Sequence, residues 1–389
     1  MKSENFETIA VRTQAERSGF REHSAPIYMT SSFMFEDAEQ ARALFADEIE
    51  GNIYSRFSNP NTTEFIQKIC KLEGAEDGIA TASGMSAIFT SMMPFLSSGV
   101  HIIVSRSVFG STHQIVTQIL PRWGIEYTYV DILDTVGWEK AFRKNTKMVF
   151  VETPSNPALD MIDLAWLSGL CKSHNVLLNV DNCFATPYLQ KPISFGADIV
   201  MHSATKFIDG QGRTIGGVIV GKKEIIAKVR FFARHTGPSM APMTAWILSK
   251  SLETLAVRMD RHCQNALALA RFLETHPKVE KVIYPFLESH PQLELAKKQM
   301  RLGGGIVTFL VRGGIEAGRK FLDATEGLSF SANLGDTRTI VTHPASTTHS
   351  KLSDEERAAV GIHPGTIRVS AGLEHIDDII SEIDRMIKA

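Results

Sequence analysis

Short apolar runs alternate with stretches of helical periodicity between residues 62 and 255. Parallel strands need long crossover connections that are usually helices, so this alternation predicts a largely parallel sheet with helices on both faces. The predicted strands are Gly78–Thr81, His101–Ser105, Ile125–Val130, Met148–Glu152, Val176–Asp181, Ile199–His202 and Gly217–Val220. The predicted helices that separate most of them cover residues 62–73, 86–96, 111–122 and 163–174. Ligands of such sheets bind at the carboxyl ends of the strands.

The chain has 389 residues, which is too long for one ordinary hydrophobic core. Residues 1–60 contain few apolar side chains and are expected to form an arm that contacts a neighbouring subunit. Residues 61–255 are expected to hold the α/β sheet, and residues 256–389 a smaller α+β domain entered through a helix over 240–275. Its predicted strands are Lys281–Tyr284, Gly304–Leu310, Thr339–Thr342 and Thr366–Ser370, and its predicted helices cover 290–301, 315–324, 353–359 and 375–388.

Composition excludes several classes of protein. The formal net charge is −2 and both signs are interspersed, whereas a nucleic-acid-binding surface needs a clustered basic excess. No apolar run is long enough to span a bilayer, and residues 1–7 lack the apolar core of a secretory signal. The four scattered cysteines favour reduced thiols in a cytoplasmic protein. His343 and His349 have no third ligand close in sequence, so no metal site is expected.

One predicted strand ends in an unusual way, on Ser203-Ala204-Thr205-Lys206. Lysine normally lies on a solvated face, but here it follows a run that should be buried. A desolvated lysine loses part of its positive charge and becomes a nucleophilic amine. The alternative is an ordinary strand end at which Lys206 reaches solvent.

Other strand ends carry polar or aromatic residues that each have a structural alternative. The turn Ser83-Gly84-Met85 joins a strand to a helix, and such turns bind phosphate groups. Phe109 follows the next strand, and an aromatic residue in that position, taken alone, more often belongs to the core. Asp181 ends a buried strand and needs a partner, which a core arginine could supply. Arg368 lies inside a strand, either as a bidentate carboxylate binder or in a core ion pair.

Together these residues meet the requirements of pyridoxal 5′-phosphate. Lys206 can form a Schiff base with the aldehyde, Asp181 can pair with the protonated ring nitrogen, and Phe109 can stack on the ring. The groups available for the phosphate are Gly84, Met85, Ser203 and Thr205. The same predicted sheet edge therefore offers a catalytic lysine and a cofactor site.

The motifs also resemble those of a known family. The segments Tyr54-Ser55-Arg56, Ser83-Gly84-Met85, Glu152-Thr153-Pro154-Ser155-Asn156-Pro157, Asp181-Asn182 and Ser203-Ala204-Thr205-Lys206 resemble the Cys/Met-metabolism (trans-sulfuration) enzymes nearly end to end. The resemblance implies the fold type I, aminotransferase-like architecture and a homotetramer built from two tight dimers. It implies that Tyr54 and Arg56 reach the cofactor phosphate of the neighbouring subunit, that Asn156 faces the cofactor hydroxyl, and that Arg368 holds the substrate α-carboxylate.

Within the family, Asp209-Gly210-Gln211-Gly212-Arg213 and Leu334-Gly335-Asp336-Thr337-Arg338 are most similar to members that act on O-succinylhomoserine with sulfide. Most family members carry tyrosine where this chain has Phe109. A thiolate (parent pKa ~8.5) leaves more readily when it is protonated, whereas a carboxylate (~4) needs no acid. The resemblance thus implies γ-replacement that yields homocysteine and succinate, a step of methionine biosynthesis. Cystathionine γ-synthase, O-acetylhomoserine sulfhydrylase, a methionine or cystathionine lyase and a non-catalytic binding protein remain alternatives.

Overall fold

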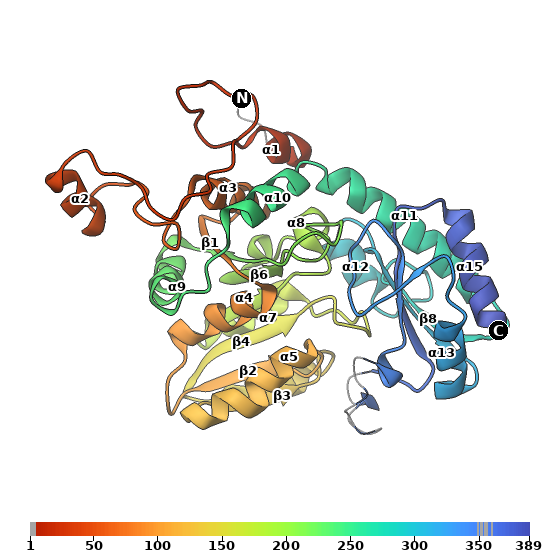
Figure 1. The fold of residues 1–389 in the computed structure, drawn as a ribbon. Coiled ribbons are helices and arrows are strands. Elements are labelled where there is room, and N and C mark those ends of the chain that lie inside the picture. The colour runs from red at the N-terminus through yellow and green to blue at the C-terminus, as the bar shows by residue number, and fades with distance from the viewer. Residues whose placement is uncertain (1–4, 348–349, 351–352, 354–356, 359–360) are drawn as a thin grey trace.

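The computed structural model describes residues 5–347, 350, 353, 357–358 and 361–389. Over these residues the chain forms two β-sheets, which lie side by side and are linked by the long helix α11 (Leu255–Glu274) (Figure 1). The larger sheet has the strand order β1-β7-β6-β5-β4-β2-β3. Its strands are β1 (Asp77–Thr81), β2 (His101–Ser105), β3 (Glu126–Val130), β4 (Thr146–Glu152), β5 (Leu177–Asp181), β6 (Ile199–Ser203) and β7 (Gly217–Gly221).

The larger sheet confirms the predicted architecture. The strands from β3 to β6 pair in parallel, and only β7 runs antiparallel to its neighbours β1 and β6. β1 therefore points the same way as β6, and the carboxyl ends of β1, β2, β4, β5 and β6 meet at one edge. All seven predicted strands are present, each within two residues of its predicted bounds.

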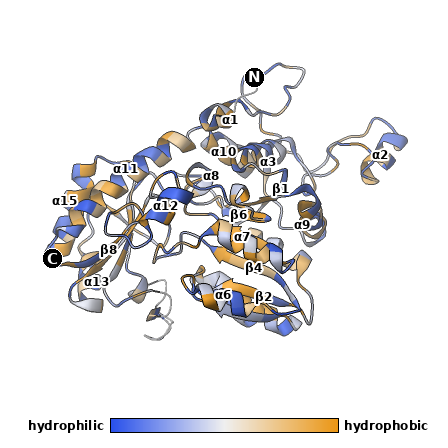
Figure 2. Ribbon diagram, turned by 180° about the vertical axis from the view of Figure 1, so that it is seen from behind, coloured by the Kyte–Doolittle hydropathy of each residue, from blue (hydrophilic) through white to orange (hydrophobic). Residues whose placement is uncertain are grey.

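Helices cover both faces of this sheet, because its central strands are apolar on both sides (Figure 2). One face packs against α3 (Pro60–Glu73) and α7 (Leu164–Ser173), through residues such as Phe65 and Leu167. The other face packs against α4 (Gly84–Met92) and α9 (Lys223–Thr236), through residues such as Ile88 and Val229. The remaining helices near this sheet are α5 (Gly110–Gln114), α6 (Thr135–Ala141), α8 (Thr186–Leu189) and α10 (Pro242–Leu252).

The second sheet has the order β10-β11-β12-β9-β8, and only its β10–β11 pair is parallel. Its strands are β8 (Val279–Ile283), β9 (Ile306–Val311), β10 (Ser329–Phe330), β11 (Ile340–Thr342) and β12 (Thr366–Ser370). The helices α11, α13 (Gly314–Asp323) and α15 (Ile376–Lys388) share one apolar core with this sheet, and α12 (Leu293–Gln299) lies between the two sheets. Segregated strands and helices of this kind match the predicted α+β layer.

Two predicted helices need comment. The single helix expected over 240–275 is wrong, since α10 ends at Leu252 and α11 begins at Leu255. The N–H groups of Glu253 and Thr254 donate hydrogen bonds to the carbonyl oxygens of Lys250 and Ser251, three residues earlier. Such bonds tighten the last turn of α10, and the helix ends there. The helix predicted over 353–359 falls largely outside the described residues.

The first 60 residues contain two short helices, α1 (Phe6–Arg12) and α2 (Ala38–Phe45). Phe6 in α1 packs on Tyr188 of the body, with 5.0 Å between the ring centroids. The segment that carries α2 extends away from both sheets (Figure 1). Phe20 and Met34, which both precede α2 in the chain, are 95% and 98% exposed. Over this stretch the chain leaves large apolar side chains uncovered by its own body.

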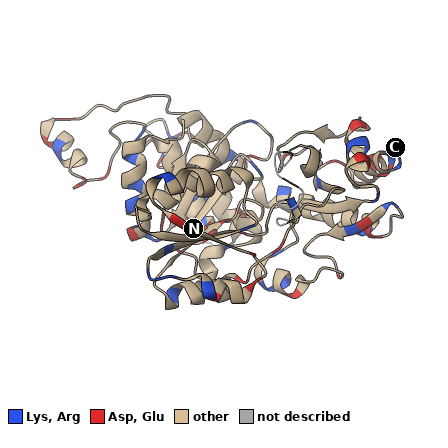
Figure 3. Cartoon of the chain, turned by 90° about the horizontal axis from the view of Figure 1, so that it is seen from below, with Lys and Arg blue, Asp and Glu red and all other residues tan. Residues whose placement is uncertain are grey.

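Charged side chains are distributed over the outer helices, with Lys and Arg close to Asp and Glu (Figure 3). Within the described residues, no helix combines the length and the apolar character that a bilayer crossing would require.

Candidate active site

Lys206 follows β6 at the carboxyl edge of the larger sheet and is partly buried. Its Nζ donates a hydrogen bond to Oδ1 of Asn333, at 2.6 Å, from the loop that precedes β11. Burial lowers the pKa of the lysine, and the nearby positive charge of Arg368 lowers it further. The structure therefore places an amine with reduced basicity at the edge, rather than a lysine that extends into solvent.

Asp181 ends β5 and is 5% exposed. Its Oδ1 accepts a hydrogen bond from the N–H of Cys183 at 3.0 Å, and within the described residues it makes no ion pair. Burial raises the pKa of Asp181 to about 6, while the backbone bond from Cys183 and the charge of His202 act in the opposite direction. A buried carboxylate that makes no ion pair can pair with a cationic ligand group such as a protonated ring nitrogen.

Phe109 lies at the start of α5, beyond the end of β2, and is 44% exposed. Phe109 therefore does not pack in the hydrophobic core, and the alternative interpretation of this residue is wrong. Its backbone N–H donates a 2.8 Å hydrogen bond to Oε2 of Glu152, the last residue of β4. The Phe109 ring is thus free to contact a ligand while its backbone is tied to the sheet.

The turn after β1 lies directly on the end of β6. A Cβ atom added to Gly84 would come within 2.5 Å of Cβ and 2.6 Å of Oγ of Ser203, so only glycine fits at this position. Gly84 and Met85 open α4, where the first N–H groups have no partners inside the helix. Ser83 caps the helix by accepting a hydrogen bond from the N–H of Ser86. This arrangement suits an anion such as phosphate.

The hydroxyl of Thr205 is less available for binding a phosphate than the sequence suggests. Its Oγ1 accepts a hydrogen bond from the N–H of Gly216 at 3.1 Å and lies 3.3 Å from the Gly216 carbonyl oxygen. Its hydroxyl already holds the loop that leads into β7, so a phosphate would share that hydroxyl with the protein backbone.

Arg368 on β12 reaches the same region from the second sheet and is 5% exposed. Its Nη1 donates to Oδ1 of Asn156 at 3.2 Å, and its Nη2 donates to the backbone oxygen of Asn333 at 3.0 Å. The buried Nε has no hydrogen-bond partner, and within the described residues the guanidinium makes no ion pair. Burial lowers the pKa of Arg368 to about 10, which still leaves it charged at neutral pH.

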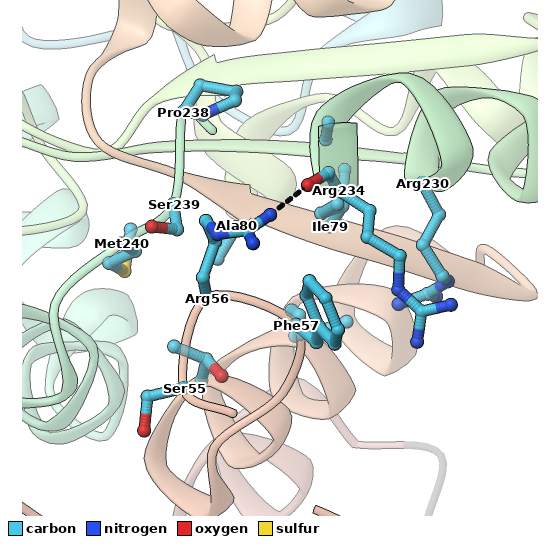
Figure 4. Close-up of a pocket in the computed structure, with 13 residues that line it drawn as sticks. Ser55, Arg56, Phe57, Ile79, Ala80, Arg230, Arg234, Pro238, Ser239 and Met240 are labelled. Carbon is cyan, nitrogen blue, oxygen red and sulfur yellow. Dashed lines mark hydrogen bonds between the residues drawn. The ribbon is translucent and has the colours of Figure 1, made fainter. Parts of the chain in front are cut away.

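Tyr54 and Arg56 do not contact these residues within the same chain. Tyr54 is 42% exposed, and Arg56 donates a hydrogen bond from Nη1 to the backbone oxygen of Arg234 on α9 (Figure 4). The guanidinium groups of Arg56 and Arg234 lie 4.7 Å and 4.4 Å from the ring centroid of Phe57. Arg56 therefore lines a basic pocket beside α9 together with Arg230 and Arg234, and Lys206 is not among the residues that line it.

Comparison with known proteins identifies the family. The model of the Cys/Met metabolism PLP-dependent enzymes matches residues 7–388. The chain belongs to this family. It is therefore a pyridoxal phosphate-dependent enzyme of the trans-sulfuration group, with the fold type I architecture.

Named relatives include more than one activity. An O-succinylhomoserine sulfhydrylase of Pseudomonas aeruginosa is 48% identical over 384 residues, which cover 99% of this chain and 95% of that protein. An L-methionine γ-lyase of Fusobacterium nucleatum is 42% identical over 388 residues, which cover 99% and 98%. A Campylobacter jejuni structure named as an O-acetylhomoserine (thiol)-lyase has a TM-score of 0.95 and 35% identity, covers 99% of this chain and 100% of its own, and contains N′-pyridoxyl-lysine-5′-monophosphate.

The residues at the sheet edge fit the family's cofactor. Pyridoxal phosphate requires an amine for its aldehyde, a carboxylate and an aromatic ring for its own ring, and backbone N–H groups for its phosphate. Lys206 with its lowered pKa, the buried Asp181, the partly exposed Phe109 and the N-terminus of α4 supply these groups. Sequence reasoning missed two neighbours of these groups. Glu152 carries the same signal as Asp181, a carboxylate at the end of a buried strand, and could have been noticed. Asn333 lies 127 residues from Lys206 along the chain and gave no local signal.

Proposed function

We propose that the enzyme replaces the γ-succinyloxy group of O-succinylhomoserine with sulfide and releases homocysteine and succinate. The observation that carries this proposal is Phe109, an exposed ring without a hydroxyl at the end of the sheet edge. A carboxylate leaves from the γ-carbon without an acid, whereas a thiolate profits from one. The 48% identity to an O-succinylhomoserine sulfhydrylase supports the same activity.

The proposed site assigns each residue a task. Bound pyridoxal phosphate would supply an electron sink for the charge that develops at the substrate α-carbon. Lys206 holds the cofactor until the substrate amine displaces it, and its free amine then removes the α-proton. Because the pKa of Lys206 is lowered, more of that amine is neutral and able to accept a proton. Asp181 pairs with the ring nitrogen, Phe109 stacks on the ring, and Asn156 faces the ring hydroxyl.

Arg368 is proposed to bind the substrate α-carboxylate. Its Nε is buried without a hydrogen-bond partner, and within the described residues no carboxylate neutralises it. Its contact with the Asn333 backbone also links it to the residue that holds Lys206. A carboxylate bound there would place the α-carbon near the lysine amine.

We further propose a homotetramer of two tight dimers in which Tyr54 and Arg56 contact the cofactor phosphate of the neighbouring subunit. The phosphate groups from the chain's own body would be Gly84, Met85, Ser203 and Thr205. Support comes from the arm, which leaves apolar side chains exposed, and from the absence of any contact of Arg56 with Lys206 within the described residues. A cytoplasmic location is part of the same proposal.

Methionine γ-elimination is the second candidate, because relatives named as methionine γ-lyases are 42% identical over nearly the whole chain.

A panel of turnover assays separates the candidate functions. O-Succinylhomoserine and O-acetylhomoserine are each supplied with sulfide or with cysteine, and L-methionine is supplied alone. The proposal expects homocysteine and succinate to form fastest from O-succinylhomoserine and sulfide. Faster reaction with cysteine indicates a cystathionine γ-synthase, and faster reaction of the acetyl ester indicates an O-acetylhomoserine sulfhydrylase. Dominant release of an α-keto acid and ammonia from methionine overturns the proposal.

A further inference from the structure

Glu152 is a buried acid that the proposed mechanism does not use. It is the last residue of β4, and its Cα pairs in register with that of Asp181 on β5. Paired residues of parallel neighbouring strands point to the same face of a sheet, so the two carboxyl groups lie on the same face at the same edge. Glu152 is 4% exposed and Asp181 is 5% exposed.

The side chain of Glu152 reaches the residue proposed to stack on the cofactor. Its Oε2 accepts the 2.8 Å hydrogen bond from the backbone N–H of Phe109, although the two residues are 43 positions apart in sequence. The Phe109 backbone lies at the start of a short helix, while its ring is 44% exposed. Glu152 therefore fixes the backbone of a residue whose side chain is partly exposed.

The groups that face Glu152 include no close cation. Asp181 on β5 and the thiol of Cys183 are its acidic neighbours, and the amine of Lys206 is close enough to Cys183 to lower the pKa of that thiol. Within the described residues Glu152 makes no ion pair. Burial raises the pKa of Glu152 well above its ordinary value, and the charge of Asp181 raises it further. Two buried carboxyl groups side by side retain one proton between them in preference to two negative charges.

We propose that Glu152 is a positioning residue that stays a neutral carboxylic acid, fixes the Phe109 backbone through Oε2 and shares its proton with Asp181. Asp181 then carries the single negative charge that faces the cofactor ring nitrogen, and the proton of Glu152 orients that carboxylate. This inference rests on the proposed placement of the ring between Phe109 and Asp181.

Three substitutions separate the parts of this inference. Glu152→Gln keeps the shape, the acceptor for Phe109 and a donor toward Asp181, but cannot ionise. Glu152→Asp keeps an ionisable group but is one methylene too short to reach the Phe109 N–H. Glu152→Ala removes both contacts. Cofactor-free enzyme is titrated with pyridoxal phosphate, and the Kd and the visible circular dichroism of the bound cofactor are recorded, since the latter reports how the ring is held.

We expect Glu152→Gln to bind the cofactor within about threefold of the parent enzyme and to keep its dichroism. We expect Glu152→Ala and Glu152→Asp to bind about tenfold more weakly with reduced dichroism, because the lost hydrogen bond frees Phe109. Parent-like Kd and dichroism in Glu152→Ala or Glu152→Asp would overturn the positioning role. If Glu152→Gln binds the cofactor as weakly as Glu152→Ala does, the proposal that Glu152 is a neutral acid is wrong.

Two controls complete the design. Far-ultraviolet dichroism of the cofactor-free variants checks folding, and Glu152→Gln decides the protonation state even if Glu152→Ala does not fold. Asp181→Ala tests the underlying site separately. If Asp181→Ala leaves the Kd and the dichroism unchanged, the proposed cofactor placement is wrong. If Asp181→Ala weakens cofactor binding and reduces the dichroism while Glu152→Ala changes neither, only the proposed role of Glu152 is wrong.

Discussion

The carboxyl edge of the larger sheet and the N-terminal arm contribute to the proposed site in different ways. At the edge, Asp181 and Glu152 are buried and Lys206 is hydrogen-bonded to Asn333, all within one chain. In the arm, Tyr54 is exposed and Arg56 rests on α9 of the same chain. In the proposed site, the reacting end of the cofactor is held by the chain's own core, whereas the phosphate end also receives Tyr54 and Arg56 from a neighbouring subunit.

The strongest test of this comparison is Lys206→Ala. Removing the proposed anchor and base should lower kcat by more than about 10³-fold, while the fold survives because the side chain is only partly buried. Borohydride reduction followed by peptide mass analysis should find the pyridoxyl group on Lys206 in the parent enzyme and nowhere in the variant. A variant that retains substantial turnover would contradict the role of the edge.

Arg368→Met should come next in effect. Loss of the only guanidinium proposed for the α-carboxylate should lower kcat/KM by about 10²-fold, mainly through KM, since the hydrogen-bonded charge pair with the substrate can no longer form. Arg368→Lys serves as the matched control, because it keeps the charge without the paired N–H groups. Steady-state kinetics compare Arg368→Met with Arg368→Lys. Equal KM values for Arg368→Met and the parent would show that Arg368 does not bind the α-carboxylate.

Arg56→Ala probes the arm and should weaken cofactor binding about tenfold without changing the lysine chemistry. The complementation test is run at a low cofactor concentration, at which the Arg56→Ala enzyme alone stays largely free of cofactor and therefore inactive. If Arg56 acts on the neighbouring subunit, mixing Arg56→Ala with Lys206→Ala chains restores activity under these conditions, because each mixed dimer holds one intact site. Random exchange predicts roughly a quarter of the parent activity. Mixtures that stay as inactive as their components would place Arg56 in its own chain's site.

The smallest effect is expected from the pH dependence of the cofactor-free protein. Burial raises the pKa of Asp181 from 3.8 to about 6 in the folded state, so folding favours its protonated form. The resulting stability is complete below about pH 4 and is lost as the pH rises to about 6. Calorimetry should show Tm falling over this window more in the parent than in Asp181→Asn. If Tm falls equally with pH in the parent and in Asp181→Asn, Asp181 is not desolvated in the folded state.

Much of the fold could be predicted because its signals are local. The central strands β4, β5 and β6 are largely apolar runs that end at polar residues, and the polar strand ends indicated Asp181 and Lys206 as candidate site residues. Contacts between distant residues could not be predicted in this way. Asn333 meets Lys206 only after the second sheet has docked, and the break at Glu253 contains neither glycine nor proline to indicate it. β10 pairs over only two residues and has too short a pattern to detect.

The central claim is that an edge bearing Phe109 expels a carboxylate rather than a thiolate. It is tested most directly by the ratio of kcat/KM for O-succinylhomoserine with sulfide to kcat/KM for γ-elimination of methionine, measured in the parent enzyme and in Phe109→Tyr. We predict a ratio above about 10² in the parent and a fall of about tenfold in Phe109→Tyr, because the added hydroxyl can protonate a leaving thiolate. A parent ratio below one, or a ratio that Phe109→Tyr leaves unchanged, would contradict the claim.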